Sequence, residues 1–286
     1  MKRSAWLAAV VLSAGLSTGA FAEITGSAKL EGKAPKRAPV AGLASVKECA
    51  AMHKDPLLDE SIVTDDQGNL QNVVVFLKGD NVPKGTPPSE PAVLEQKGCQ
   101  YVPHVLDVTV GQAVEAKNVD GFLHNVHTLP EANEPSNMAQ PTKQTDKLKP
   151  IKEPERIKVK CDVHPWMSAW IYAFDNPYHS TTAEDGSYEI KTDGLKDGTY
   201  TIVAWQEKLG ESQPQKVTVK GGKADKPITF TFKPKAAMAP QAAPVAAREV
   251  TLASLTEKKA DPTACCEDGK CDEKAAQAKP AVAVSK

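Results

Sequence analysis

Beyond its first residues, the 286-residue sequence has no long apolar run, no excess of charge and few aromatic residues. Its longest apolar stretch runs from residue 5 to about residue 16, whereas a membrane-spanning helix needs about 20 apolar residues. With 35 basic and 36 acidic residues, the net charge is −1. This balance favours neither a nucleic-acid-binding protein nor one that binds a membrane surface. A Cys-x-x-Cys-His motif for haem attachment is also absent.

The first 22 residues have the pattern of a secretory signal peptide. Lys2 and Arg3 precede the short apolar stretch, and small residues end in Ala20-Phe21-Ala22. This order of a basic region, an apolar core and an A-x-A site predicts cleavage after Ala22. We therefore expect a periplasmic or secreted protein with no membrane span.

Short strands separated by turn residues predict an all-β chain with two folded domains, 23–175 and 176–235. In the first domain we expect strands at 24–30, 72–77, 105–110, 113–117, 157–161 and 170–174. In the second we expect strands at 188–190, 199–205, 215–219 and 228–232. A domain of about 60 residues is marginal alone, so we expect the second domain to pack on the first.

Residues 236–286 differ in composition from the rest of the chain. They are rich in Ala, Pro, Lys and Glu and contain no aromatic residue. Such a segment cannot bury enough apolar surface to fold, so we expect a disordered tail. The tail contains Cys265, Cys266 and Cys271, whose thiols are suited to Cu(I) but are equally suited to oxidation or to pairing with another chain.

The segment Cys161-Asp-Val-His164-Pro-Trp-Met167 carries the strongest chemical signal. The preceding strand alternates, so Ile157, Val159 and Cys161 should share one face. A thiolate, imidazoles and a weak thioether select copper and stabilise both of its oxidation states. Zinc gains little from a Met ligand. A complete blue-copper site needs a second imidazole from elsewhere, and Leu123-His124-Asn-Val-His127 offers two candidates that cannot face the same side of a strand.

The Cys-x-x-His-x-x-Met loop resembles the ligand loop of amicyanin, and His-Asn-Val-His resembles the upstream segment of amicyanin and plastocyanin. In those blue-copper proteins the first His of that segment is the ligand. The resemblance implies one type 1 copper ion bound by His124, Cys161, His164 and Met167. It also implies that Asn125 steadies the loop of residues 161–167, which we call the Cys loop, by hydrogen bonding.

The resemblance also extends to the fold. It implies a cupredoxin-type Greek-key β-sandwich in the first domain. The second domain carries a D-G-x-Y-x-I…G-x-Y-x-I pattern that resembles carboxypeptidase-regulatory-like domains, which are transthyretin-like β-sandwiches with structural or adhesive roles. The whole arrangement resembles a group of exported bacterial proteins that join these two domains.

Cys49 and Cys99 remain in the folded part, and two interpretations stay open. A disulfide between them closes a loop of about 50 residues and stabilises the fold by about 4 kcal/mol. Alternatively, pairing of Cys49 with His53 and of Cys99 with His104 forms a second metal site.

The sequence favours a single-electron carrier over an enzyme, because four protein ligands leave no open coordination position. His164 would be the edge through which electrons pass to another exported redox protein, bound weakly over a small patch. Copper delivery or sequestration is the first alternative, supported by the additional cysteines. A non-redox binding or scaffold protein is the second.

Overall fold

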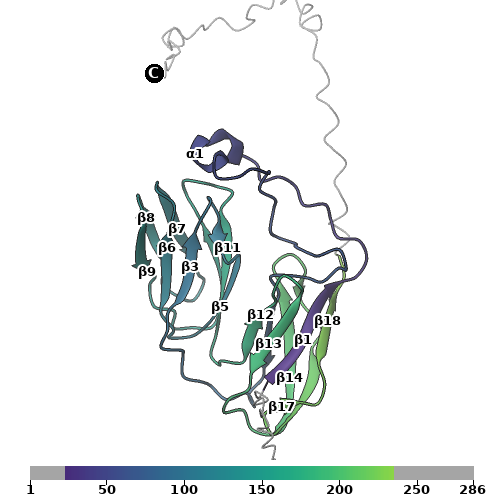
Figure 1. The fold of residues 1–286 in the computed structure, drawn as a ribbon. Helices are drawn as coiled ribbons and strands as arrows, with labels where there is room; N and C mark the ends of the chain where they lie inside the picture. Colours follow the sequence, from purple (N-terminus) through teal and green to yellow (C-terminus); the bar gives the residue numbers. More distant parts are fainter. Residues whose placement is uncertain (1–22, 235–286) are drawn as a thin grey trace, which may run out of the picture. The chain divides into compact units, whose positions relative to one another are not determined.

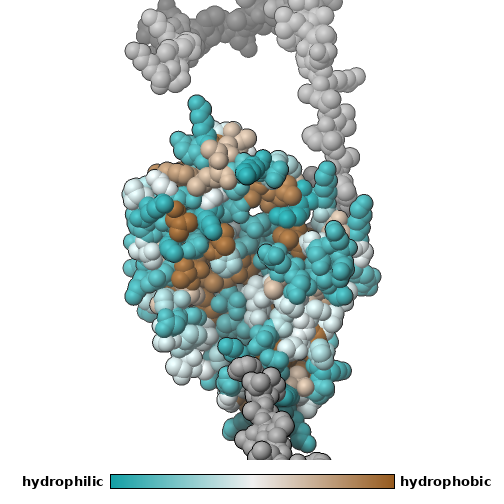
Figure 2. Space-filling model, viewed as in Figure 1, coloured by the Kyte–Doolittle hydropathy of each residue, from teal (hydrophilic) through white to brown (hydrophobic). Residues whose placement is uncertain are grey.

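The computed structural model describes residues 23–234, and this part of the chain is all-β, as predicted (Figure 1). Its only helices are the short 3-10 turn η1 (Leu43–Ser45) and α1 (Lys47–Ala50). Within these residues no helix is long and apolar enough to cross a membrane. On the face shown in Figure 2, apolar surface occurs as separate patches among hydrophilic residues.

The first β-sandwich consists of a five-stranded and a four-stranded sheet. The larger sheet has the strand order β5-β11-β10-β7-β8 and the smaller one has the order β4-β3-β6-β9. The strands of the larger sheet are β5 (Val105–Thr109), β7 (His124–Leu129), β8 (Asn137–Gln140), β10 (Arg156–Lys160) and β11 (Ser168–Phe174). Those of the smaller sheet are β3 (Ala92–Gln96), β4 (Tyr101–Val102), β6 (Val114–Asn118) and β9 (Gln144–Lys147).

The alternation of β10 directs the Cys loop toward the core of this sandwich. Ile157 and Val159 are buried while Lys158 is exposed. Cys161 continues the inward face directly after the strand and is 2% exposed. The predicted orientation of these three side chains is confirmed, and it follows from the two-residue period of a strand.

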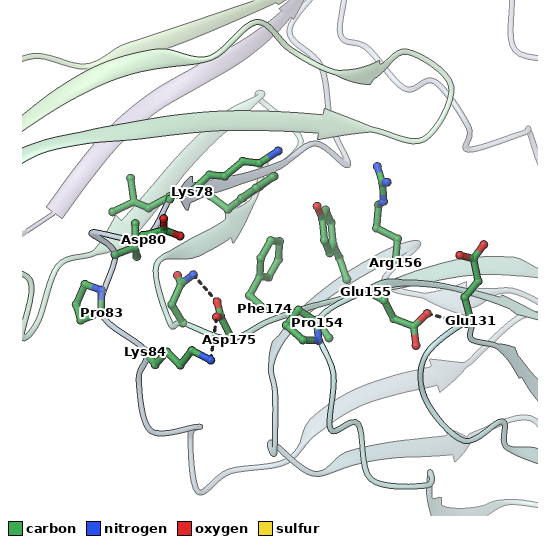
Figure 3. Close-up of a pocket in the computed structure, with 17 residues that line it drawn as sticks. Lys78, Asp80, Pro83, Lys84, Glu131, Pro154, Glu155, Arg156, Phe174 and Asp175 are labelled. Carbon is green, nitrogen blue, oxygen red and sulfur yellow. Dashed lines mark hydrogen bonds and ion pairs between the residues drawn. The ribbon is translucent and has the colours of Figure 1, made fainter.

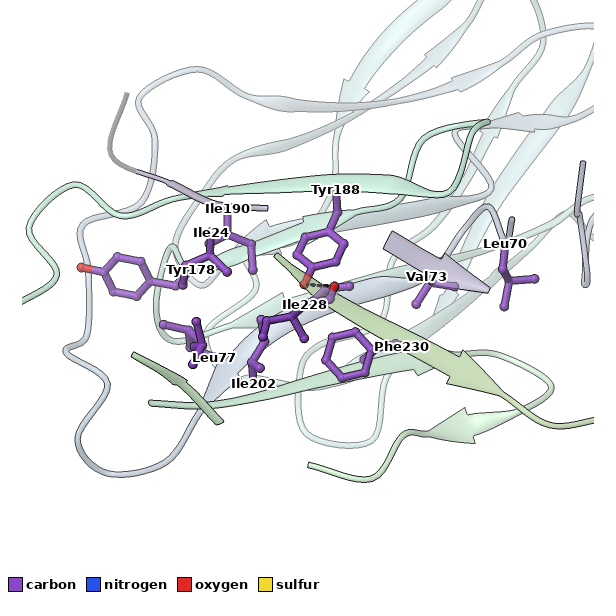
Figure 4. Close-up of a cluster of buried hydrophobic side chains, with 14 of the residues drawn as sticks. Ile24, Leu70, Val73, Leu77, Tyr178, Tyr188, Ile190, Ile202, Ile228 and Phe230 are labelled. Atoms are coloured by element: carbon purple, nitrogen blue, oxygen red, sulfur yellow. Dashed lines mark hydrogen bonds between the residues drawn. The ribbon is translucent and has the colours of Figure 1, made fainter. Parts of the chain in front are cut away.

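The second β-sandwich also has two sheets. One has the order β13-β1-β18, and the other has the order β12-β2-β14-β16-β17, with β15 paired to β14. The strands are β1 (Glu23–Leu30), β2 (Val74–Lys78), β12 (His179–Thr181), β13 (Ser187–Lys191), β14 (Gly198–Gln206), β15 (Gly210–Glu211), β16 (Gln215–Lys220), β17 (Lys223–Ala224) and β18 (Ile228–Phe232). Figure 4 shows its core, where the Tyr188 hydroxyl donates to the Ile228 carbonyl at 2.9 Å.

Two strands that the sequence placed with the domain 23–175 pair in the second sandwich instead. β1 lies between β13 and β18, and β2 lies between β12 and β14. The alternation of a strand predicts its buried face but carries no information about which distant strand it pairs with. Residues 176–235 alone would therefore lack a central strand in each sheet.

The two sandwiches share a contact made of aromatic and charged residues. Phe76, Phe174 and Trp205 belong to one buried apolar cluster. The His104 ring Nε2 lies 2.7 Å from a Glu207 carboxylate oxygen, and the Trp170 indole donates to the other oxygen at 2.8 Å. His104 comes from the first sandwich and Glu207 follows β14 of the second, so this buried ion pair joins the two.

We expect Glu207→Gln to lower the free energy of unfolding by about 3 kcal/mol near pH 6 and by clearly less near pH 9. Burial alone would lower the pKa of His104, but the hydrogen bond and charge of Glu207 outweigh burial and raise that pKa. A His whose pKa is raised by folding contributes its full stabilisation below the unfolded-state pKa of about 6.5. This stabilisation is lost as pH rises through the folded-state pKa.

For Glu207, the pH dependence of the stabilisation has the opposite sign. Burial raises its pKa, but the hydrogen bond and charge of His104 lower it overall, so its contribution is lost only as pH falls below about 4.3. Denaturant unfolding at pH 6, 7.5 and 9 measures the effect. Glu211→Gln, which removes an exposed ion pair to Lys78, should cost less than about 1 kcal/mol at every pH. An equal cost of Glu207→Gln at pH 6 and 9 would contradict a charged His104.

Candidate metal centre

The loop between β10 and β11 is a closed turn held by its own backbone. The Cys161 amide donates to the Met167 carbonyl at 3.2 Å, and the Met167 amide donates to the His164 carbonyl at 2.9 Å. The His164 amide also donates to the Cys161 sulfur at 3.3 Å. These bonds fix the thiol and the imidazole relative to each other. Met167 lies in the core at 1% exposure.

The second imidazole comes from the start of β7. The Nδ1 atoms of His124 and His164 lie 3.0 Å apart, and the Cys161 sulfur lies 3.9 Å from His164 Nδ1. Bonds of about 2.0 Å to nitrogen and about 2.3 Å to sulfur keep ligand atoms of one ion within about 4.3 Å of each other. Two ring nitrogens at 3.0 Å must share a proton or a cation, because two lone pairs repel. The distances of 3.0 and 3.9 Å lie within the limit for ligands of one soft metal ion.

Asp120, which the sequence analysis did not identify, holds His124 in place. Its carboxylate is 2% exposed and accepts from His124 Nε2 at 2.8 Å. It also accepts from the Gly98 and Cys99 amides at 2.9 and 3.0 Å. A proton on Nε2 leaves the lone pair of the neutral ring on Nδ1, the atom that faces His164. The sequence gives no signal for this role beyond an Asp four residues before a His.

Burial keeps both imidazoles in the neutral form that binds metals. It lowers the pKa of His124, although Asp120 opposes the shift. Burial also lowers the pKa of His164, and the neighbouring His124 lowers it further. Phe122 packs near both rings, with centroids 5.1 Å from His124 and 6.3 Å from His164.

His164, which we expected to be the edge through which electrons pass, is only 3% exposed. Residues 42–53, which we call the cover, lie over this end of the sandwich and contain η1 and α1 (Figure 1). Leu43 packs in the same apolar cluster as Trp166, and the ring centroid of Trp166 is 5.1 Å from that of His164. Sequence patterns gave no signal that a segment more than a hundred residues upstream would reach this loop.

A disulfide between Cys49 and Cys99 attaches the cover to the first sandwich. The alternative pairing with histidines is not present: His53 Nε2 donates to the Gly98 carbonyl at 2.8 Å, and His104 contacts Glu207. The two sulfurs and a ring nitrogen of His164 lie within 4.8 Å of one another. The disulfide thus adjoins the candidate metal centre. The tail cysteines lie outside the described residues.

The remaining residues of the two motifs have separate contacts. The Asn125 side chain accepts from the Asp162 amide at 3.2 Å and donates to the Met138 carbonyl at 3.1 Å. These bonds connect the Cys loop, β7 and β8. His127 points to the other side of β7 and lies 2.9 Å from the Asp162 carboxylate, so it is not part of the donor set.

A large cleft of about 1010 Å³ lies elsewhere, beside β2, β10 and β11 (Figure 3). Its lining includes Lys78, Asp80, Lys84, Glu155 and Arg156. The mixed charges favour no ligand of one sign, and none of the metal donors above lines it.

No protein-family model and no curated protein matches this sequence. Among solved structures, the chain is similar to the purple cupredoxin from Nitrosopumilus maritimus, with 20% identity over 29% of this chain and 99% of that one and a TM-score of 0.26. It is similar to amicyanin from Paracoccus versutus, with 15% identity over 35% of this chain and 97% of that one and a TM-score of 0.28.

A third similar structure is the Cu-containing nitrite reductase from Thermus scotoductus, with 21% identity over 35% of this chain and a TM-score of 0.28. This chain covers 25% of that reductase. At these TM-scores the similarities carry no argument about function. The two-sheet architecture of the first sandwich agrees with the predicted cupredoxin-type fold.

We expect Asp120→Ala to weaken metal binding at this candidate centre by about 10- to 100-fold, because the tautomer and orientation of His124 are then no longer fixed. Copper affinity is measured by competition with a chelator, together with thermal unfolding to confirm folding. The matched control is Asp107→Ala, which removes a half-buried carboxylate that lies 2.6 Å from the His179 ring and is not part of the donor set. Equal loss of affinity in both variants would contradict the positioning role of Asp120.

Proposed function

We propose that the chain binds one copper ion at His124, Cys161 and His164, with Met167 as a weak axial ligand, and acts as an exported single-electron carrier. The observation that carries this proposal is the buried donor set, in which a thiol and two imidazoles from β7 and the Cys loop lie within 4.8 Å of one another. Copper bound to such ligands is stable as both Cu(I) and Cu(II) and so transfers single electrons.

The protein's part in this function is to keep the donor atoms fixed. The backbone bonds of the Cys loop hold Cys161 and His164, and Asp120 holds His124. Asn125 ties the loop to β7. A rigid donor set lowers the reorganisation that accompanies a change of charge.

The surface near the centre supports a weakly bound redox partner. Leu123, Val163 and Met52 are 41%, 42% and 45% exposed. Leu123 and Val163 directly precede His124 and His164 in the sequence, and Met52 belongs to the cover. A small apolar area is typical of transient electron-transfer complexes. The partner we propose is another exported redox protein. Export itself, with cleavage after Ala22, is part of the proposal.

Burial of His164 favours copper handling as a second candidate function. An imidazole that is 3% exposed exchanges its metal slowly, as expected of a protein that stores copper. Fast, reversible electron exchange with a small inorganic oxidant distinguishes the carrier from a storage protein.

The resemblance of the second sandwich to carboxypeptidase-regulatory-like domains remains a proposal, and we assign that sandwich no catalytic role.

Adding Cu(II) to the metal-free chain, with Cys265, Cys266 and Cys271 replaced by Ser, tests the proposed centre. We expect an intense visible band from charge transfer between the Cys161 thiolate and copper. The band should be lost in Cys161→Ala and in His124→Ala. His127→Ala, which changes a His of the same strand on its other side, should retain it. A colourless copper complex would reject the type 1 centre.

A further inference from the structure

A second set of metal donors surrounds His164 on the side of the cover. The Cys49 and Cys99 sulfurs and one ring nitrogen of His164 lie within 4.8 Å of one another, and the three residues are buried. His164 also belongs to the donor set with His124 and Cys161. A ring nitrogen of this imidazole is therefore within 4.8 Å of the Cys161 sulfur and of both sulfurs of the Cys49–Cys99 pair.

We propose that the dithiol form of Cys49 and Cys99 binds Cu(I) together with His164, forming an outer copper site that shares this imidazole with the inner centre. The proposal goes beyond electron transfer, and the outer site does not require the inner centre to hold copper. In the disulfide form the two sulfurs are bonded to each other and offer no thiolate. In the dithiol form they are two soft donors beside an imidazole, a set that suits Cu(I).

The change of state is a thiol–disulfide exchange with an exported dithiol reductant. The reductant supplies two electrons and two protons, the bond between the Cys49 and Cys99 sulfurs breaks, and a disulfide forms on the reductant. When Cu(I) binds, the two thiols release their protons to solvent. The outer site is therefore present in the dithiol form and absent in the disulfide form, in which the cover is bonded to the first sandwich beside His164.

The exchange requires a movement of the cover that gives the reductant access to the disulfide. Both sulfurs are 0% exposed, and a reductant must reach a sulfur to attack it. α1 has only four residues, and besides the disulfide the cover is attached by the His53–Gly98 hydrogen bond and the packing of Leu43. Displacing this short segment exposes the disulfide to the reductant and opens a route to His164. The shared imidazole then provides a path by which Cu(I) passes from the outer to the inner site.

The test uses the full chain with Cys161 and the three tail cysteines replaced by Ser, so that Cys49 and Cys99 are its only thiols. The disulfide and dithiol forms are titrated with Cu(I) against a chromophoric Cu(I) chelator. We expect the dithiol form to bind one more Cu(I) per chain than the disulfide form, in which only the imidazoles and Met167 of the inner centre remain as donors. Because the inner thiolate is absent, this result is independent of the visible band that tests the proposed electron carrier.

His164→Ala in the same background should weaken Cu(I) binding at least about tenfold, since it removes one of three donors. The matched control is His127→Ala, which removes an imidazole that contacts Asp162 outside the donor set, and it should leave the affinity unchanged. Equal Cu(I) binding by both redox forms, or affinity that does not depend on His164, would overturn the proposal. Loss of the β-sheet circular dichroism signal on reduction would also overturn it, because the donors would no longer be assembled.

Discussion

The candidate centre depends on a buried pair of imidazoles whose Nδ1 atoms are 3.0 Å apart. Buried polar groups are costly unless each has a partner. Here Asp120 accepts from the outer nitrogen of His124, and the Gly98 and Cys99 amides satisfy that carboxylate in turn. The inner nitrogens are left with only each other and the Cys161 sulfur. The surroundings thus fix the orientation of His124 and leave open only the cation or proton that it shares with His164.

The same network connects the centre to the cover. Cys99 donates to Asp120 through its backbone and bonds to Cys49 through its side chain. The Trp166 indole donates to the Cys99 carbonyl at 3.1 Å. One short turn at residues 98–99 therefore contacts the His124 side of the centre through Asp120 and the His164 side through the disulfide. A change in this turn acts on both imidazoles together.

Some of this arrangement could be predicted from local sequence patterns. The two-residue period of β10 predicted that Cys161 faces the core, and the same period separated His124 from His127 on β7. The rest depends on contacts between distant segments. No periodic pattern in the sequence predicts which strands β1 and β2 pair with, because this depends on how separate segments pack. The same holds for the Asp120 carboxylate beside residues 98–99 and for the His104–Glu207 pair. The burial of His164 has the same cause, since the cover comes from a distant part of the sequence.

The chain path explains why a cover is present at all. β1 and β2 are both strands of the second sandwich, so the chain between them leaves that sandwich to form the cover and is back in its apolar core at Ile62 and Leu70. Within this excursion, Cys49 is bonded to the first sandwich. A connection that long would be costly to order without attachment, and the disulfide and the packing of Leu43 supply it. Because the attachment point adjoins His164, the bond that orders the excursion also encloses the imidazole, and fold stability and access to the centre depend on the same pair of sulfurs.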